Sequence, residues 1–158
     1  MPSQSVKECQ RCNALTKSGQ RCKNRTCKSG KCWVHLKRDT GLRVKPSQVS
    51  GGGMGLWTTK RIKPNQLIGK YTGERMTKAQ VNQRYVTRKP QYVLCSGNRC
   101  VDARKTNSSA VRFANDARGT RFKNNARLKG LSLKSASKGI PANREIFTGY
   151  GSAYWVNR

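Results

Sequence analysis

The chain has 158 residues, of which 34 are Lys or Arg and six are Asp or Glu, so its formal net charge is +28. This length suits one modest domain plus a small module, and no apolar run approaches the roughly 20 residues that a membrane span needs. The N-terminus lacks a signal-peptide-like apolar region, so we expect an intracellular protein. The charge predicts a polyanionic partner, nucleic acid above all, and the alternative is a basic surface without a specific partner.

Residues 1–40 predict a small basic module that a metal ion stabilises. Five of the seven cysteines lie within residues 9–32, close to the only histidine, which is more typical of a metal site in a reducing compartment than of a disulfide framework. Metal binding would supply the folding free energy that so polar a segment cannot gain from burial. The ligands predicted for a tetrahedral structural zinc ion are Cys12, Cys22, Cys32 and His35.

Two further cysteines of this module, Cys9 and Cys27, are surplus to a four-ligand site. They either replace one of the ligands or remain free thiols. The competing interpretation of the whole segment is a set of reduced cysteines in a disordered basic tail. The tight turn from Cys32 to His35, which would place a thiolate beside an imidazole, favours the metal site.

Residues 41–158 predict a second, β-rich domain of many short strands, one short helix and long irregular connections. The capping-box pattern at 77–80 predicts a helix over 78–88 that ends before Pro90. Ser96-Gly97-Asn98 predicts a hairpin turn, so Cys95 and Cys100 are interpreted as hairpin side chains rather than metal ligands. The strand-like segments are 42–49, 56–59, 67–71, 92–95, 99–102 and 145–150, and 126–133 carries a further apolar pattern.

Three segments of this domain carry chemistry, and their order matters more than any one of them. Gly53-Met54-Gly55-Leu56-Trp57 follows a strand-like stretch, and its glycines permit positive φ and close approach of a ligand to the backbone. Arg112-Phe113-Ala114-Asn115 comes next, and the last strand runs into Tyr150 between two glycines. Together, residues 41–158 resemble the SET-domain protein lysine methyltransferases.

The resemblance implies a mainly β SET-domain fold of several short sheets, in which the C-terminal segment forms a pseudoknot, an exception to unthreaded chains. It implies S-adenosylmethionine as cofactor, Tyr150 as the catalytic tyrosine and Tyr92 as a wall of the lysine channel. Such a channel lowers the pKa of the lysine amine by desolvation, so that the amine gives its proton to solvent, and aligns the neutral amine with the methyl group. The residues expected at the cofactor are Gly53, Met54, Gly55, Leu56, Trp57, Arg112, Phe113, Asn115, Asp116 and Trp155.

Two features depart from the family pattern. Asp116 stands where the family usually has histidine, so its backbone can still meet the adenine while its side chain brings a new charge. The chain ends at Arg158 without the Cys-rich segment that often closes the lysine channel. Compact size without this lid is typical of viral or bacterial members, which suggests a virus acting on host chromatin.

These features predict a methyltransferase that modifies a lysine of a histone or another chromosomal protein, in the nucleus or on chromatin, or else in the virion. We expect contact with nucleic acid and none with a membrane, and a homodimer stays open. One alternative is a catalytically inactive SET-like protein that binds or packages nucleic acid. The other is a zinc-module adaptor whose SET-like half is only a scaffold.

Overall fold

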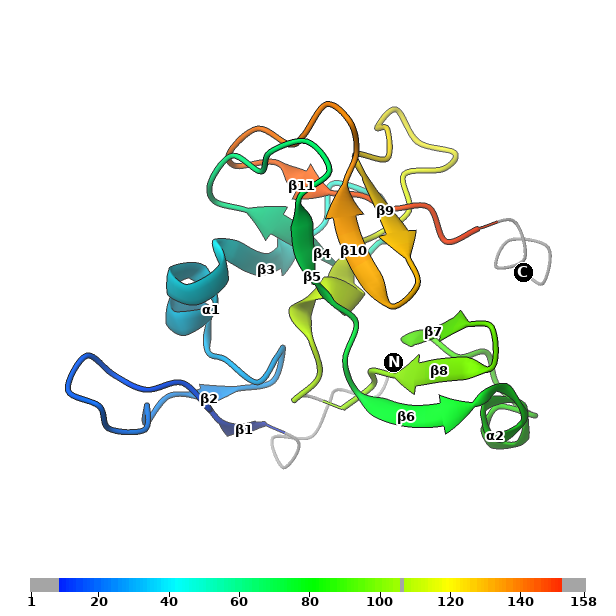
Figure 1. Ribbon diagram of the computed structural model, residues 1–158, viewed down its shortest axis with the longest axis horizontal. Coiled ribbons are helices and arrows are strands. Elements are labelled where there is room, and N and C mark those ends of the chain that lie inside the picture. The colour runs from blue at the N-terminus through cyan, green and yellow to red at the C-terminus, as the bar shows by residue number, and fades with distance from the viewer. Residues whose placement is uncertain (1–8, 106, 152–158) are drawn as a thin grey trace.

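The computed structural model describes residues 9–105 and 107–151, which form a mainly β molecule with four small sheets (Figure 1). Helix α1 spans Trp33–Thr40, helix α2 spans Lys78–Arg84, and a 3₁₀ helix, η2, spans Ala110–Phe113. Within the described part of the chain, no helix is long and apolar enough to cross a membrane. The expected mainly β class is therefore confirmed, although the described residues hold two α-helices rather than one.

All the paired strands are antiparallel. The N-terminal module contains the pair β1 (Gln10–Arg11) and β2 (Arg25–Thr26). The other sheets have the orders β5-β10-β9, β11-β4-β3 and β6-β8-β7. Their strands are β3 (Leu42–Pro46), β4 (Met54–Thr58), β5 (Leu67–Lys70), β6 (Glu74–Thr77), β7 (Val93–Ser96), β8 (Arg99–Asp102), β9 (Ala126–Lys129), β10 (Ser132–Ser135) and β11 (Glu145–Ile146).

The main core lies where strand β4 and helix η2 meet the other sheets. Leu56 and Ile146 are fully buried there, and Leu133 and Ile140 are almost so. Leu36 of helix α1 packs into the same core, so the N-terminal module contributes apolar surface to the larger domain. The division into a module of residues 1–40 and a domain of residues 41–158 stays a prediction.

Helix α1 was not predicted, because the sequence around it carries weak helix signals. Its N-cap, Cys32, offers no capping side-chain bond, and the helix holds only eight residues. Gly41 ends it with a left-handed φ of 71° and donates its N–H to the carbonyl of Lys37. Burial of Leu36 stabilises a helix that local propensity alone would not.

Helix α2 begins with the predicted capping box, in which Thr77 and Gln80 exchange side-chain bonds with each other's backbone. It is shorter than predicted, because it ends at Arg84 instead of residue 88. Tyr85, the C-cap, directs its hydroxyl to the buried carboxylate of Asp102 at 2.6 Å. This tertiary bond fixes the end of the helix.

The C-terminal segment lies between two earlier parts of the chain. Phe147 forms a parallel bridge with Asn115, and Thr148 forms another with Ala126. The amide of Asn125 adds two bonds, because it donates to the carbonyl of Glu145 and accepts from the N–H of Phe147, both at 2.9 Å. The segment thus passes the loop that joins residues 115 and 126, as expected for the pseudoknot.

Candidate active site and metal centre

The glycine segment at the start of strand β4 is fixed by a buried carboxylate. Glu145 is 1% exposed, and its two oxygens accept from the hydroxyl of Ser47 at 2.5 Å and from the N–H of Gln48 at 2.7 Å. A Cβ on Gly55 would lie 2.2 Å from Glu145 Oε1, so only glycine permits this approach. Gly53 has a φ of 60° and accepts the N–H of Ser47 at 2.9 Å, which closes the loop 47–53.

Asn115 joins this glycine segment to the C-terminal segment. Its side-chain amide donates to the carbonyl of Met54 at 3.1 Å, and its own carbonyl accepts the N–H of Thr148 at 2.8 Å. Helix η2, which precedes it, begins at Ser109, whose hydroxyl accepts the N–H of Val111. The three motifs that the sequence separates by about 100 residues therefore meet around one asparagine.

Tyr150 is held at both ends of the residue. Its hydroxyl donates to the carbonyl of Ala114 at 2.9 Å, and its backbone N–H donates to Oδ2 of Asp116 at 2.8 Å. The other carboxylate oxygen of Asp116 accepts the N–H of Arg118 at 2.9 Å and the amide of Asn124 at 3.1 Å. The acid that replaces the usual histidine is thus engaged by N–H donors.

Further aromatic side chains approach this tyrosine. The ring of Tyr92 meets Phe113 edge to face, with centroids 5.9 Å apart, and the guanidinium of Arg112 lies over both rings. Tyr71 belongs to the same group: burial, followed by the charge of Tyr150, raises the pKa of its phenol well above the usual range. The Tyr71 hydroxyl therefore stays protonated at neutral pH.

A cavity of about 490 Å³ opens beside Tyr150. Asp116 is the one expected cofactor residue in its described lining, and Phe122, another lining residue, stacks on Phe147 with centroids 5.4 Å apart. The cavity is lined by Asp116, Ala117, Arg118, Gly119, Thr120, Phe122, Lys123, Asn124, Gly149 and Gly151.

The remaining cofactor residues expected from the sequence lie in different surroundings. Leu56 is fully buried in the core. Trp57 lies on strand β4 beneath the ammonium of Lys45, which is 3.8 Å from the ring centroid. Trp155 falls outside the described residues. The sequence analysis did not identify Glu145 and Tyr71 as site residues. Glu145 could have been noticed, because it is one of only six acidic residues and lies next to apolar residues in a strand-like segment.

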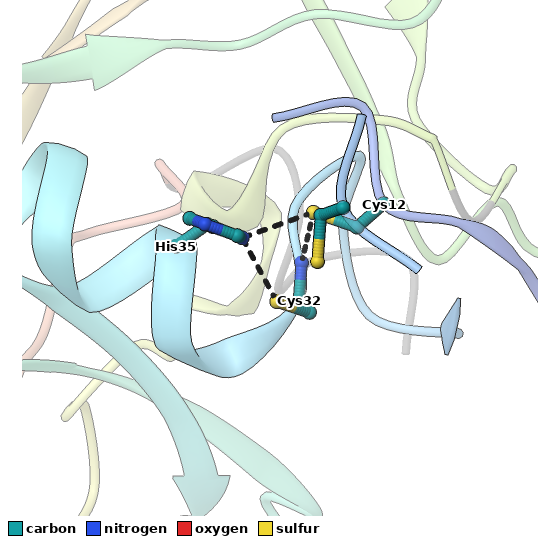
Figure 2. A group of neighbouring side chains, drawn as sticks. Cys12, Cys32 and His35 are labelled. Carbon is teal, nitrogen blue, oxygen red and sulfur yellow. Dashed lines mark hydrogen bonds between the residues drawn. The ribbon is translucent and has the colours of Figure 1, made fainter. Parts of the chain in front are cut away.

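The four residues predicted to bind a metal come together in the N-terminal module. Cys12, Cys22, Cys32 and His35 are all buried, and their potential ligand atoms lie within 4.8 Å of one another, so the cluster could hold a metal ion. Figure 2 shows the ring of His35, on helix α1, next to the sulfurs of Cys12 and Cys32, with Nδ1 at 3.5 and 3.3 Å.

The surroundings of this cluster favour the thiolate of Cys32, whereas at Cys22 the lowering effect of the Asn24 N–H is outweighed by burial and by the side chains of Cys32 and Cys12, which raise the pKa of that thiol. Burial raises the pKa of the Cys32 thiol, but the backbone N–H of His35 and the side-chain amide of Asn24 outweigh burial and lower that pKa to about 6. The N–H of Cys32 also donates to the sulfur of Cys12 at 3.2 Å, and that of Asn24 to the sulfur of Cys22 at 3.4 Å. Thiolate ligands with N–H donors around them suit a soft divalent metal.

The other four cysteines form two disulfides, Cys9–Cys27 and Cys95–Cys100. The expectation that Cys9 and Cys27 replace a ligand or remain free is therefore wrong. The reason is strand register: Gln10 faces Thr26 in the β1–β2 pair, which brings the flanking cysteines together, and Cys95 faces Cys100 in the β7–β8 pair. Neither pair belongs to the metal cluster.

Arg112 connects this module to the aromatic group. It is 6% exposed, and its guanidinium donates to the carbonyls of Ala103, Lys105 and Lys28, the last at 3.0 Å. Its Nε has no hydrogen-bond partner among the described residues. A backbone group of the metal-binding module therefore holds the arginine that lies over Tyr92 and Phe113.

The comparisons with known proteins agree with this fold. The family model of the SET domain matches residues 53–151. The chain belongs to the SET domain family, a family of S-adenosylmethionine-dependent methyltransferases. A comparison with curated protein sequences gives no match.

Solved structures show the same fold. A chain of the Chaetomium thermophilum polycomb repressive complex 2 matches with a TM-score of 0.60 and 24% identity, covering 85% of this chain and 17% of that one. The complex in an autoinhibited conformation bound to S-adenosylmethionine matches with a TM-score of 0.60 and 23% identity, over 89% and 18%. The methyltransferase domain of human PR domain-containing protein 2 has a TM-score of 0.54 and 21% identity, over 75% and 84%. The present chain thus spans less than a fifth of the polycomb chains.

Proposed function

We infer that this protein is a protein-lysine N-methyltransferase that uses S-adenosylmethionine and modifies a histone or another chromosomal protein. The proposal rests on the contacts that bring Tyr150, Asn115 and the glycine segment 53–55 together. The amide of Asn115 donates to the carbonyl of Met54 in the glycine segment, and its backbone carbonyl accepts the N–H of Thr148, two residues before Tyr150. Membership of the SET domain family supports the methyl-transfer chemistry.

The site fits the cofactor by its shape and by its polar groups. The cavity of about 490 Å³ beside Gly149 and Gly151 has room for a nucleoside, and Asp116 lines it. The turn at Gly53–Gly55 and Asn115, which are joined by the bond from the Asn115 amide to the carbonyl of Met54, do not line this cavity and would contact another part of the cofactor. When bound, S-adenosylmethionine supplies a methyl group on a positively charged sulfur. Arg112, Phe113 and Asp116 complete the set that we assign to its binding, and Trp155 stays a prediction.

The chain's own residues prepare the lysine amine. The hydroxyl of Tyr150 donates a hydrogen bond to the carbonyl of Ala114 and keeps its proton, so lone pairs of the phenol oxygen remain as acceptors for an incoming amine. Tyr92 and Phe113 offer apolar surface that lowers the pKa of a lysine, whose ordinary value is about 10.4. Alignment of a neutral amine in a water-poor channel accounts for much of the rate increase in such transfers.

We assign zinc to the Cys12, Cys22, Cys32 and His35 cluster, in a structural role. Three thiolates and an imidazole are the usual donors of a closed tetrahedral zinc site. All four ligand residues are buried, which suits a structural ion better than a catalytic one. The metal would stabilise the module that holds Arg112 through Lys28.

The likeness to chains of the polycomb repressive complex 2 and the charge of +28 support a chromatin location with nucleic acid close by. The viral source suggested by compact size stays a prediction, as does a homodimer. The alternative, an inactive packaging protein, shares the charge but does not need the ordered Tyr150.

A methyl-transfer assay tests the proposal. We would incubate the protein with S-adenosylmethionine and core histones, free and in nucleosomes, and read methyl additions by intact mass. The cofactor should also raise the melting temperature by mass action. No mass gain on any histone, together with an unchanged melting temperature, would leave the packaging protein as the better account.

A further inference from the structure

The sheet β6-β8-β7 has two different faces. Register pairs Arg75 with Val101 and Met76 with Cys100, and successive side chains of a strand point to opposite faces. The face with Met76 and Cys100 packs against Val81 of helix α2. The opposite face therefore carries Arg75 and Val101 and, two residues before Val101 on strand β8, Arg99.

A groove of about 670 Å³ is lined by Arg75, Arg99 and Val101 of this second face, and Met76 and Cys100 of the same strands also border it. The β9–β10 turn and the end of strand β5 form its other wall; these elements lie beside the β6-β8-β7 sheet in Figure 1. Its described lining contains three cations and no carboxylate. The full lining is Lys70, Tyr71, Thr72, Gly73, Arg75, Met76, Thr77, Gln80, Asn98, Arg99, Cys100, Val101, Leu131 and Ser132.

The three cations, Lys70, Arg75 and Arg99, are exposed, and within the described part of the chain none forms an ion pair with a carboxylate. The described carboxylates have partners elsewhere. Asp39 pairs with Lys31 and Arg38, Glu74 and Asp102 pair with Arg84, Asp116 accepts N–H groups, and Glu145 accepts from Ser47 and Gln48. No described acid of this chain is therefore left to neutralise the groove.

We propose that this groove binds the phosphodiester backbone of a nucleic acid. Lys and Arg supply the charge in such contacts, and Ser, Thr and Asn side chains supply further donors to phosphate oxygens. Lys70, Arg75 and Arg99 provide the first kind of contact, and Thr72, Asn98 and Ser132 the second.

A nucleic acid fits better than an acidic protein segment. A short acidic segment would neutralise the groove alone, whereas the surface beyond it is also basic in a chain of net charge +28. A long polyanion continues across that surface and releases counterions at each phosphate that it contacts. A long polyanion therefore suits a basic surface that extends beyond the groove better than a short acidic segment does.

Tyr71 lines the groove and lies close enough to Tyr150 of the proposed site that, after burial, the charge of Tyr150 raises the pKa of its phenol. This relation to catalysis rests on the proposed function, but binding itself does not. A nucleic acid held there would let a strongly basic enzyme approach a basic chromosomal substrate without mutual repulsion.

The test compares two triple variants of equal net charge. The groove variant is Lys70→Gln/Arg75→Gln/Arg99→Gln. The control is Arg61→Gln/Lys138→Gln/Arg144→Gln, whose exposed cations lie on loops joined by the Ile62–Ile140 bridge and do not line the groove. Fluorescence anisotropy measures binding of the full chain to a labelled 20-base-pair DNA duplex at several salt concentrations.

We expect the groove variant to lose on the order of tenfold or more in affinity, and its salt slope to fall by about 3, since each phosphate contact contributes about 0.9. The control variant should keep most of the affinity for the duplex and most of the salt slope. Equal losses in the two variants would overturn the assignment, because net charge alone would then explain binding. A single Arg75→Gln variant, with a slope reduced by about one, serves if the triple variant does not fold.

A second probe separates the two kinds of polyanion. Unlabelled polyglutamate of 20 residues is added to the complex of the chain with the labelled duplex. If polyglutamate displaces the duplex at lower concentration than unlabelled duplex does, the groove is a site for acidic protein and the proposal is wrong. The assay uses no S-adenosylmethionine, so its outcome is independent of whether the methyltransferase assignment holds.

Discussion

The backbone N–H of Tyr150 donates to the carboxylate of Asp116 across 2.8 Å. This single bond ties the last described turn of the chain to the loop that follows Asn115. The same carboxylate accepts from Arg118 N–H and from the Asn124 amide, so one acid organises both walls of the cavity beside Tyr150. Asp116 therefore acts as a positioning residue in the proposed site.

Asp116→Ala should destabilise the protein by about 2 kcal/mol, because it leaves buried N–H donors without an acceptor. It should also lower methyl transfer, since Tyr150 loses one of its two anchors. Asp116→Asn keeps one acceptor oxygen, so it should lose less stability and less methyl transfer than the Ala variant. Urea denaturation and the intact-mass assay measure the two effects; equal stability of the Ala variant and the parent would contradict this role.

Tyr150→Phe should reduce methyl transfer by about 100-fold or more, the range found when a positioned acid–base group is removed. The ring remains, so the melting temperature and its rise with S-adenosylmethionine should persist. Tyr85→Phe is the matched control, because Tyr85 gives its hydroxyl to Asp102 beside helix α2. Equal loss of activity in both variants would show a general effect on folding.

Glu145→Gln should weaken cofactor binding more than it lowers turnover. The carboxamide of the variant turns an N–H₂ group toward either Ser47 or Gln48, where the structure needs an acceptor. The loop 47–53 would loosen, and the KM for S-adenosylmethionine should rise several-fold. Ser47→Ala removes only one of the two bonds and should give a smaller rise; the reverse order would argue against this account.

Removal of the metal should unfold the N-terminal module and reduce methyl transfer, because Arg112 then loses the carbonyl of Lys28. A chelator titration followed by circular dichroism and the activity assay measures both, with re-added zinc restoring them. Cys22→Ser should behave like the chelated protein. A Cys27→Ser variant is the control: it breaks the Cys9–Cys27 disulfide, which lies outside the cluster, and should retain bound zinc.

Acid should reveal the ion pair between Glu74 and Arg84. Hydrogen bonds from Arg84 hold the pKa of Glu74 below its ordinary value. The pair therefore stabilises the fold fully above the ordinary carboxyl pKa, and this stabilisation is lost as the pH falls through the lower folded-state value. Glu74→Gln should be less stable than the parent at pH 7, and the gap should close in strong acid. A gap that is independent of pH would exclude an ionic origin.

The sequence predicted those features that depend on local pattern. The capping box at Thr77, the hairpin around Gly97 and the grouping of Cys12, Cys22, Cys32 and His35 all follow from spacing. Features that depend on tertiary contacts were not predictable. Helix α1 is stabilised because Leu36 is buried in the core. The disulfides form because strand register brings the cysteines of each pair together.

The site shows the same division. Tyr150 and Asn115 could be identified from their motifs. The hydrogen bond from Arg112 to the carbonyl of Lys28, in contrast, joins residues 84 positions apart, and no sequence pattern in either segment indicates it. Glu145 could be noticed as an unusual acid, but its partners Ser47 and Gln48 lie almost 100 residues earlier. Such contacts reflect the whole topology.

The C-terminal segment lies between Asn115 and Ala126 and pairs with both, so this part of the fold can form only late in synthesis. Until residues 145–150 have left the ribosome and entered that gap, Tyr150 is absent, and the carboxylate that anchors the turn of Gly53–Gly55 is absent too. Pairings between such distant residues form slowly, because a long loop of chain must close first. The site proposed for methyl transfer is therefore incomplete until strand β11 and Tyr150 dock, so a shortened chain without this segment should lack the proposed activity.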